Sequence, residues 1–260
     1  MLTIMFEFKR GQITVVIILG IVMLLLFGII SYSVGYFWQG KEKSSMTLNT
    51  EPVKTYIESC LKKVGEDGLI FVGKHGGYVI LPPQSDSLFL LPYYLHGNES
   101  YVISKTELEN QLSFYVKEEL SFCLKNFLIF KEQGYELNWG KIKITTRVTE
   151  TKVHFNLDLS VTLIKGGVSK EMNTFSSFVP SRIFIIRQMA EDFLNEQKKN
   201  SSLVCISCFT NTLKKNLRIE SYFLGEDNIM FIVIDEKSQI NHPYKYSFIN
   251  KYKFEKNGTK

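Results

Sequence analysis

KVHFNLDLSVTLI, residues Lys152–Ile164, is the stretch that decides the fold of this chain. Apolar and polar residues alternate along it, as in a β-strand with one buried face and one wet face. The neighbouring stretches KIKITTRVTE, residues 141–150, and VSKEMNTFSSFV, residues 168–179, alternate in the same way. Turns are expected between the three stretches, at Glu150-Thr151 and Gly166-Gly167. The pattern predicts an antiparallel meander.

One face of the first stretch carries His154, Asn156 and Asp158, which are two residues apart. A histidine, an amide and a carboxylate in one row are suited to ligand binding or to catalysis. The same row is also typical of the wet face of an amphipathic strand. We interpret it as that wet face, with binding or catalysis as the alternative.

Helical spacing recurs before this β block. It predicts a helix over Pro52–Val64 and another over Ser104–Phe130, the second opened by a capping box of Ser104 and Glu107. Between the two helices, Gly68–Pro83 is expected to form two short strands around a turn.

After the β block, the spacing predicts a helix over Pro180–Lys199. The segments LRIESYF, NIMFIVID and YKYSFINKYKF then follow as a closing set of strands. The expected fold class is α+β, with helices packed on antiparallel β-sheet.

Two of the four cysteines occupy matching places in the helices predicted before the β block. VKTYIESCLK, residues Val53–Lys62, and VKEELSFCLK, residues Val116–Lys125, share a V-K-x5-C-L-K frame around Cys60 and Cys123. Helical spacing places each cysteine on the apolar face of its helix. In an oxidising compartment we expect a Cys60–Cys123 disulfide, and buried free thiols are the alternative.

The other two cysteines, Cys205 and Cys208, form the C-x-x-C of VCISC. This spacing suits a redox couple, half of a zinc site or a local disulfide. The surroundings are not βαβ and the four histidines are scattered singly, so we expect a local disulfide, although three pairings of four cysteines remain open. A membrane-tethered thiol-redox protein or enzyme that uses these cysteines is an alternative function.

An apolar stem, FEFKRGQITVVIILGIVMLLLFGIISYSVGYFW, opens the chain. Its run from Ile13 to Phe37 contains no charge and, as a helix, is longer than the roughly 30 Å of a hydrocarbon core. Lys9 and Arg10 precede the run, so the positive-inside rule places the N-terminus in the cytoplasm. We expect a single-pass protein of the cell membrane, with lipid as a partner. Its parts are a basic N-terminus at residues 1–12, a transmembrane helix at residues 13–38, a linker at residues 39–51 and an extracytoplasmic domain at residues 52–260.

The junction Lys9-Arg10-Gly11-Gln12, followed at once by the apolar run, resembles the class III signal of archaeal type IV pilin-like proteins. This resemblance implies cleavage between Gly11 and Gln12 and a stem that is kept on the mature chain. At the fifth mature position, where many such proteins carry Glu, this chain has Val16. The whole chain resembles uncharacterised single-span surface proteins of archaea, through its V-x-x-Y-I-x-x-C helix, the Gly76-Gly77-Tyr78 turn and the segment FIVIDEKS. No activity follows from the second resemblance.

Small residues fall near one face of the stem, where they allow membrane helices to approach closely. They are Gly20, Gly28, Ser31 and Gly35. Self-association, or a place as one subunit of a heteromeric membrane complex, would use this face. Three sequons, at Asn98, Asn200 and Asn257, are possible glycosylation sites and fit an external domain.

A ligand patch for a glycan or a peptide is expected where glycines and aromatic residues gather. Its members are Gly76, Gly77, Tyr78, Tyr93 and Tyr94. The alternative is that these residues form a hairpin turn beside aromatic residues of the core and bind no ligand.

The net charge of +5 comes from the tail, because six lysines and one acidic residue lie between Lys237 and Lys260. The common catalytic motifs are absent, so we expect no enzyme, no cofactor, no metal site and no nucleic-acid partner. The sequence predicts a membrane-anchored structural or adhesive surface protein, pilin-like in its stem, whose disulfide-stabilised ectodomain binds protein or glycan.

Overall fold

The computed structural model describes residues 10–39, 48–199, 204–205, 208, 216–225, 227–240 and 243–253. In residues 10–39, the side chains described are those of Val15 and residues 17–33. The chain divides into two units, Met1–Thr47 and Leu48–Lys260.

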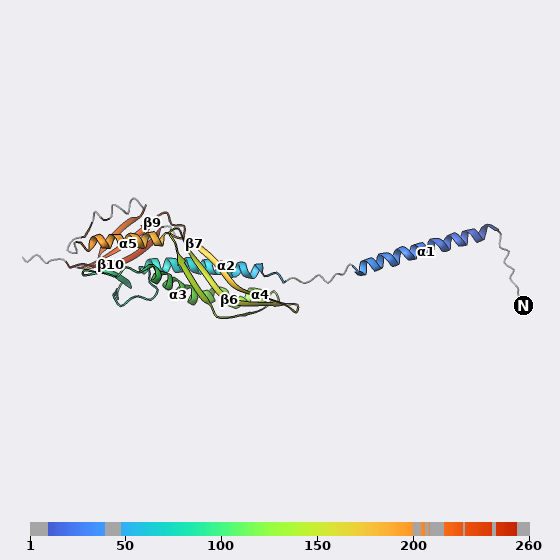
Figure 1. Ribbon diagram of the computed structural model, residues 1–260, viewed down its shortest axis with the longest axis horizontal. Helices are drawn as coiled ribbons and strands as arrows, with labels where there is room; N and C mark the ends of the chain where they lie inside the picture. Colours follow the sequence, from blue (N-terminus) through green and yellow to red (C-terminus); the bar gives the residue numbers. More distant parts are fainter. Residues whose placement is uncertain are drawn as a thin grey trace, which may run out of the picture. The chain divides into compact units, whose positions relative to one another are not determined.

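The first unit contains the helix α1, Arg10–Gln39, 30 residues long (Figure 1). Its described side chains are exposed, from Val15 to Ser33. Among the residues that the structure describes, no helix combines the length and the apolar character needed to cross a membrane. The membrane span expected at residues 13–38 therefore stays a prediction.

The second unit is α+β and contains two sheets, as the expected fold class requires. The smaller sheet has four strands and is centred on β6, which pairs antiparallel with each of the others. The strands are β4 Glu136–Trp139, β5 Lys143–Val148, β6 Lys152–Lys165 and β7 Val168–Pro180. The turns fall at the expected places, and Gly166 and Gly167 both have positive φ. The predicted meander is confirmed.

The larger sheet has six strands in the order β1-β2-β10-β9-β8, with β3 paired to β2. Its strands are β1 Ser85–Asp86, β2 Leu91–His96, β3 Glu99–Ser100, β8 Arg218–Phe223, β9 Asn228–Asp235 and β10 Tyr244–Lys251. The closing strands are thus confirmed. One pair, β10 with β2, is parallel, because β2 joins the sheet from a distant part of the chain.

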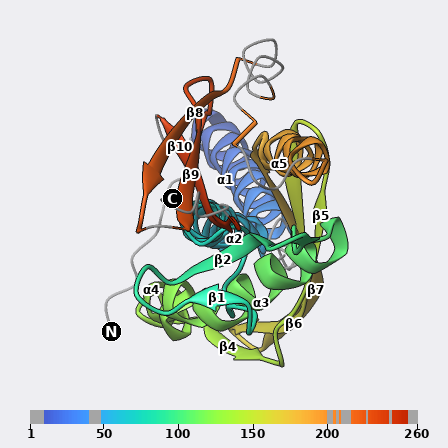
Figure 2. The same ribbon diagram turned by 90° about the vertical axis from the view of Figure 1, so that its left-hand side faces the viewer.

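Helices α2 Glu51–Lys74, α3 Lys105–Leu124 and α5 Ile183–Gln197 pack on these sheets. Figure 2 shows α2 between strands β8–β10 and strands β5–β7. A 3-10 turn, Lys125–Phe127, and the short helix α4, Leu128–Lys131, follow α3. One half of the expected capping box of α3 is present, since the Ser104 hydroxyl accepts the backbone N–H of Glu107 at 3.0 Å. The Glu107 carboxylate instead accepts from Nε2 of Gln111 at 2.7 Å.

The helix α2 is longer than expected, and the strands predicted over Gly68–Pro83 are wrong where α2 continues to Lys74. The sequence there is rich in glycine, which normally lowers the stability of a helix. Here glycine makes room for aromatic rings. A Cβ at Gly65 would lie 2.5 Å from Cε2 of Phe155, which is buried on β6.

Two further glycines of α2 make similar close contacts. A Cβ at Gly68 would lie 2.8 Å from Cδ1 of Tyr115 on α3, and a Cβ at Gly73 would lie 2.5 Å from Oη of Tyr244 on β10. Because its glycines approach α3 and both sheets, α2 joins the two sheets through one hydrophobic core.

Candidate functional site

A polar cleft of about 570 Å³ lies between α2 and the strands β6 and β7. Its walls come from the first half of α2 and from the paired ends of the two strands, the beginning of β6 and the end of β7. It is lined by Thr55, Glu58, Ser59, Lys62, His154, Asn156, Ser176, Ser177, Phe178 and Pro180.

The strand side of the cleft is set by the register of β6 and β7. His154 lies opposite Phe178, and Asn156 lies opposite Ser176. Because side chains alternate along a strand, His154 and Asn156 belong to the face opposite the buried residues of β6. Two members of the predicted wet face therefore line a cleft, whereas Asp158 is exposed and does not line it.

The helix side consists of residues three or four positions apart, which share one face of α2. They are Thr55, Glu58, Ser59 and Lys62. Their spacing is visible in the sequence, but nothing in the sequence indicates that this helix face lies against β7. The backbone N–H of Ser176 donates to Oε1 of Glu58 at 3.5 Å, which ties the helix to the strand.

Several polar groups of the cleft are free to bind a ligand. Among the described residues, no hydrogen-bond or ion-pair partner is found for the side chains of Thr55, Ser59, Lys62, Asn156 and Ser177. These hydroxyl, amide and ammonium groups offer both donors and acceptors.

An aromatic ring borders the same cleft. Phe178 is 52% exposed, although it is a large apolar residue on a strand. Its ring centroid lies 6.1 Å from that of His154, and Nζ of Lys152 lies 5.0 Å above it. The cleft thus combines one exposed apolar face with many hydrogen-bonding groups.

This combination suits a ligand that is both polar and ring-shaped, such as a saccharide. Sugar hydroxyls need donors and acceptors, and the apolar face of a sugar ring packs on an aromatic ring. Glycoside hydrolysis generally requires two carboxyl groups that flank the bond, and the lining residues supply one, Glu58.

The first cysteine pair joins α2 to α3. Cys60 and Cys123 form a disulfide with their Cα atoms 5.7 Å apart. Near it, the Tyr56 hydroxyl donates to the carbonyl oxygen of Cys123 at 3.0 Å. The matching frames of the two helices therefore correspond to two faces that lie against each other.

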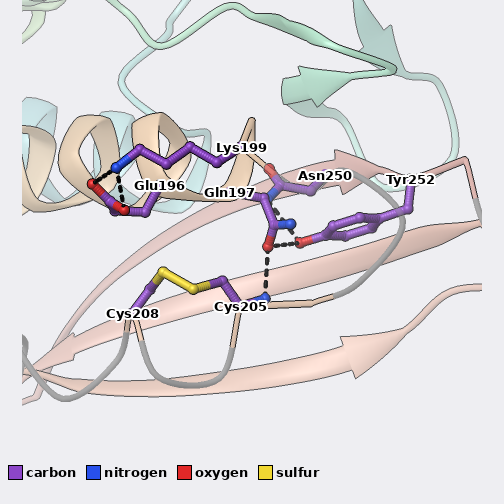
Figure 3. The surroundings of a disulfide bond; sticks show 7 residues. All are labelled: Glu196, Gln197, Lys199, Cys205, Cys208, Asn250 and Tyr252. Atoms are coloured by element: carbon purple, nitrogen blue, oxygen red, sulfur yellow. Dashed lines mark hydrogen bonds and ion pairs between the residues drawn. A yellow bond between two sulfur atoms is a disulfide. The ribbon is translucent and has the colours of Figure 1, made fainter.

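The second pair, Cys205 and Cys208, is a local disulfide beside the end of α5 (Figure 3). Gln197, the last residue of α5, lies between it and the side chain of Tyr252. The backbone N–H of Cys205 and the Tyr252 hydroxyl both donate to Oε1 of Gln197, at 2.8 and 3.4 Å. Burial raises the pKa of Tyr252 to about 12, so this hydroxyl keeps its proton.

The position of this disulfide does not favour redox chemistry. Reactive thiols are activated at helix N-termini, where the helix dipole stabilises a thiolate. Cys205 instead contacts the C-terminal end of α5, where the dipole has the opposite sign. The contact favours a structural tie between α5 and the segment that follows it.

The expected ligand patch is not formed as one surface. Tyr94 is fully buried, and its hydroxyl donates to the carbonyl oxygen of Gly76 at 2.9 Å. Gly76 and Gly77 are also buried and have positive φ, because the chain turns sharply after α2. Tyr78 and Tyr93 keep partial exposure. This prediction is corrected: the glycines and Tyr94 belong to the core and cannot touch an external ligand.

The remaining predicted sites lie partly outside the described residues. Asn98 is exposed in the β2–β3 turn, whereas Asn200 and Asn257 are not described. Of the processing residues, Lys9 is not described, and Arg10, Gly11 and Gln12 are described in backbone only, as the start of α1. On the small face of the stem, Gly20, Gly28 and Ser31 are exposed, and the surroundings of Gly35 are not described.

No family model, no curated protein and no solved structure matches this chain. In the part of the chain that the structure describes, no group of three or more His, Cys, Asp or Glu residues is placed to hold a metal ion.

Proposed function

We propose that this chain is a membrane-anchored surface protein whose second unit lies outside the cytoplasm and binds a glycan in the cleft between α2, β6 and β7. The observation that carries the proposal is the cleft itself, with its unpaired polar groups around the exposed ring of Phe178.

The anchor rests on the composition and length of α1. A helix of 30 residues rises about 45 Å, against roughly 30 Å of hydrocarbon. The uncharged run extends from Ile13 to Phe37, beyond the side chains that the structure describes. Large apolar side chains such as Leu24 and Phe27 are exposed, and exposed apolar surface of this extent is stabilised by lipid or by other helices.

The orientation rests on Lys9 and Arg10, which precede the apolar run and favour a cytoplasmic N-terminus. Two disulfides in the second unit fit this placement, since such bonds persist in oxidising compartments. Cleavage between Gly11 and Gln12, as in pilin-like proteins, would leave the helix on the mature chain. Mass spectrometry of the protein from its native membrane tests this, because a chain that starts at Met1 would rule cleavage out.

Assembly through the stem is the second part of the anchor proposal. A Cβ added at Gly20 or Gly28 would meet no atom within 4 Å, so this small face is open for another helix, either a second copy or a different subunit. Crosslinking within the native membrane distinguishes the two partners by mass.

Membrane extraction and protease treatment test the anchor and its orientation. We expect the full chain to stay with the membrane after an alkaline carbonate wash, and protease added outside the cells to degrade the second unit. Release of the intact chain by carbonate, or protection of the second unit in intact cells with cleavage only after lysis, would contradict the anchored, outward placement.

The glycan is tested with the full chain in lipid nanodiscs on a saccharide array, followed by titration of the best-bound sugars. Phe178→Ala removes the exposed ring and Asn156→Ala removes a free amide, and we expect both to weaken binding by about tenfold or more. Tyr222→Ala is the matched control, because Tyr222 is an aromatic residue of similar exposure, 47%, on β8. Absence of saccharide binding, or equal binding by Phe178→Ala and wild type, would refute the assignment.

A further inference from the structure

A corner of the second unit, where α3 ends and α4 begins, exposes large apolar side chains. We define the α3–α4 corner as residues Phe122–Lys131. Phe122, Leu128 and Ile129 are 72%, 56% and 52% exposed, although each is large and apolar. We propose that this corner lies on the lipid surface of the membrane in which the chain's own stem is anchored, a proposal that rests on the anchor proposed above.

The backbone of the α3–α4 corner is held in a defined conformation, so its exposed side chains do not belong to a frayed helix end. Lys125, Asn126 and Phe127 all have positive φ, a conformation that residues other than glycine adopt reluctantly. The turn holds because Phe127 and Phe130 are buried in the core on either side of the exposed pair. The backbone thus turns two rings inward and directs Leu128 and Ile129 outward.

The corner is also fastened to the start of α2. Tyr56 lies in the second turn of α2, and its hydroxyl donates to the carbonyl oxygens of Cys123 and Leu124 at 3.0 and 3.3 Å. The Tyr56 ring packs on the rings of Phe127 and Phe130, with centroids 6.2 and 5.4 Å apart. Figure 1 shows α4 beside the beginning of α2, with β9 and β10 at the other end of this unit.

The length of chain before α2 limits how far this end can move from a membrane. The stem helix ends at Gln39 and the second unit begins at Leu48. A stretch of this length reaches at most about 30 Å when fully extended. If α1 spans the bilayer, the start of α2 stays within that reach of the lipid surface, and the corner is fixed to this start.

The charges beside the apolar side chains suit lipid headgroups. Lys125 and Lys131 are exposed within the corner. Lys165 lies close by, since its Nζ donates to the carbonyl oxygen of Gln133 at 3.0 Å. Exposed acidic residues also lie near this group: Glu132 follows Lys131, Glu136 lies opposite Ile164 on β6, and Glu118 and Glu119 lie one turn of α3 before Phe122. Lysines around exposed apolar residues are typical of surfaces that rest on anionic membranes, where the apolar groups enter the interface and the ammonium groups meet phosphate.

The test places a tryptophan at the corner of the full-length chain in vesicles of phosphatidylcholine and phosphatidylglycerol with brominated acyl chains. Phe122→Trp is the reporter, and Phe223→Trp on β8 is the matched control, because Phe223 is also 72% exposed. The wild-type chain, with Trp38 and Trp139, supplies the background. We expect the added fluorescence of Phe122→Trp to be blue-shifted and largely lost to bromine, and that of Phe223→Trp to be unchanged.

A second pair of variants tests the charges. Lys125→Glu combined with Lys131→Glu should reduce the quenching of the Phe122→Trp reporter in the anionic vesicles. Both lysines are exposed, so the fold is not at risk. Quenching that is the same with and without these substitutions would overturn the headgroup contact.

Flotation of the same samples separates this inference from the anchor. Chains that float with the vesicles after an alkaline wash, but whose Phe122→Trp reporter is not quenched, would overturn the corner contact and leave the anchor standing. Chains that do not float would overturn both. A Phe122→Trp reporter that is blue-shifted at high protein density, without quenching by bromine, would show that a second copy covers the corner, and would overturn the proposal. Equal quenching of Phe122→Trp and Phe223→Trp would also overturn it.

Discussion

The glycine at position 73 gives the sharpest test of how α2 joins the two sheets. In a helix, replacement of glycine by alanine normally stabilises the fold by up to about 1 kcal/mol. Here a Cβ would lie 2.5 Å from Oη of Tyr244 and 2.7 Å from the backbone oxygen of Lys245. The Tyr244 hydroxyl is fully buried and donates to the carbonyl oxygen of Leu69 at 2.8 Å. Gly73→Ala must therefore displace either this hydroxyl or the backbone of β10.

The size of the effect follows from these contacts. Overpacking of a dense core costs about 1–3 kcal/mol, and a strained or lost hydrogen bond of a buried hydroxyl adds about 1 kcal/mol. The gain in helix propensity offsets about 1 kcal/mol of this cost. We expect Gly73→Ala to lower the free energy of unfolding by about 2 kcal/mol. For a unit of this length, the melting temperature should fall by about 4–8 °C.

Thermal unfolding of the full chain, followed by near-ultraviolet circular dichroism, measures this change. Gly28→Ala in α1 is the control for the chemical substitution, because a Cβ there would meet nothing within 4 Å. It should leave the melting temperature of the second unit unchanged. A melting temperature of Gly73→Ala equal to or above that of the wild type would refute the packing argument.

Three further predictions concern other parts of the second unit. Replacing both Cys60 and Cys123 by alanine should lower the free energy of unfolding by about 4 kcal/mol, because the bond closes a loop of 63 residues, and a denaturant titration without reductant that shows no loss would contradict this. Above pH 10 the domain should lose stability, since burial raises the pKa of Tyr246 and raises that of Tyr252 to about 12, so the unfolded chain releases protons first. The stability from these tyrosines is complete below pH 10 and is lost as the pH rises toward about 12, and a tyrosinate absorbance titration that shows all tyrosines ionising near pH 10 in the folded protein would exclude this account. Ser104→Ala should cost about 1 kcal/mol through loss of the α3 cap, and an unchanged melting temperature would argue against it.

Local patterns in the sequence were enough to predict three of the four strands of the smaller sheet, β5, β6 and β7, whereas the short strand β4 was missed. The alternation of KVHFNLDLSVTLI is a property of consecutive residues, and the glycine pair after it sets the next turn. The cap at Ser104 and the matching frames around Cys60 and Cys123 were also readable, because each depends on residues within one or two helical turns.

The cleft was only half visible in the sequence. The row that includes His154 and Asn156 could be placed on one strand face, and the polar face of α2 shows helical spacing. That the two faces meet depends on how α2 crosses β7, which no local pattern reports. Phe178 offered a signal of its own, as a large apolar residue on the strand face opposite Phe175 and Val179.

The sequence by itself determined which segments alternate, where several of them turn, and which cysteines share a frame, because these properties arise between near neighbours in the chain. Only the tertiary structure decided that Gly65 and Gly73 continue α2. Each lacks a side chain where the ring of Phe155 or of Tyr244 packs against the helix, and both rings come from strands far along the chain. The tertiary structure also decided that Tyr94 is core and that the cleft is open. The physical reason is that packing depends on which surfaces meet, and surfaces meet between residues distant in sequence.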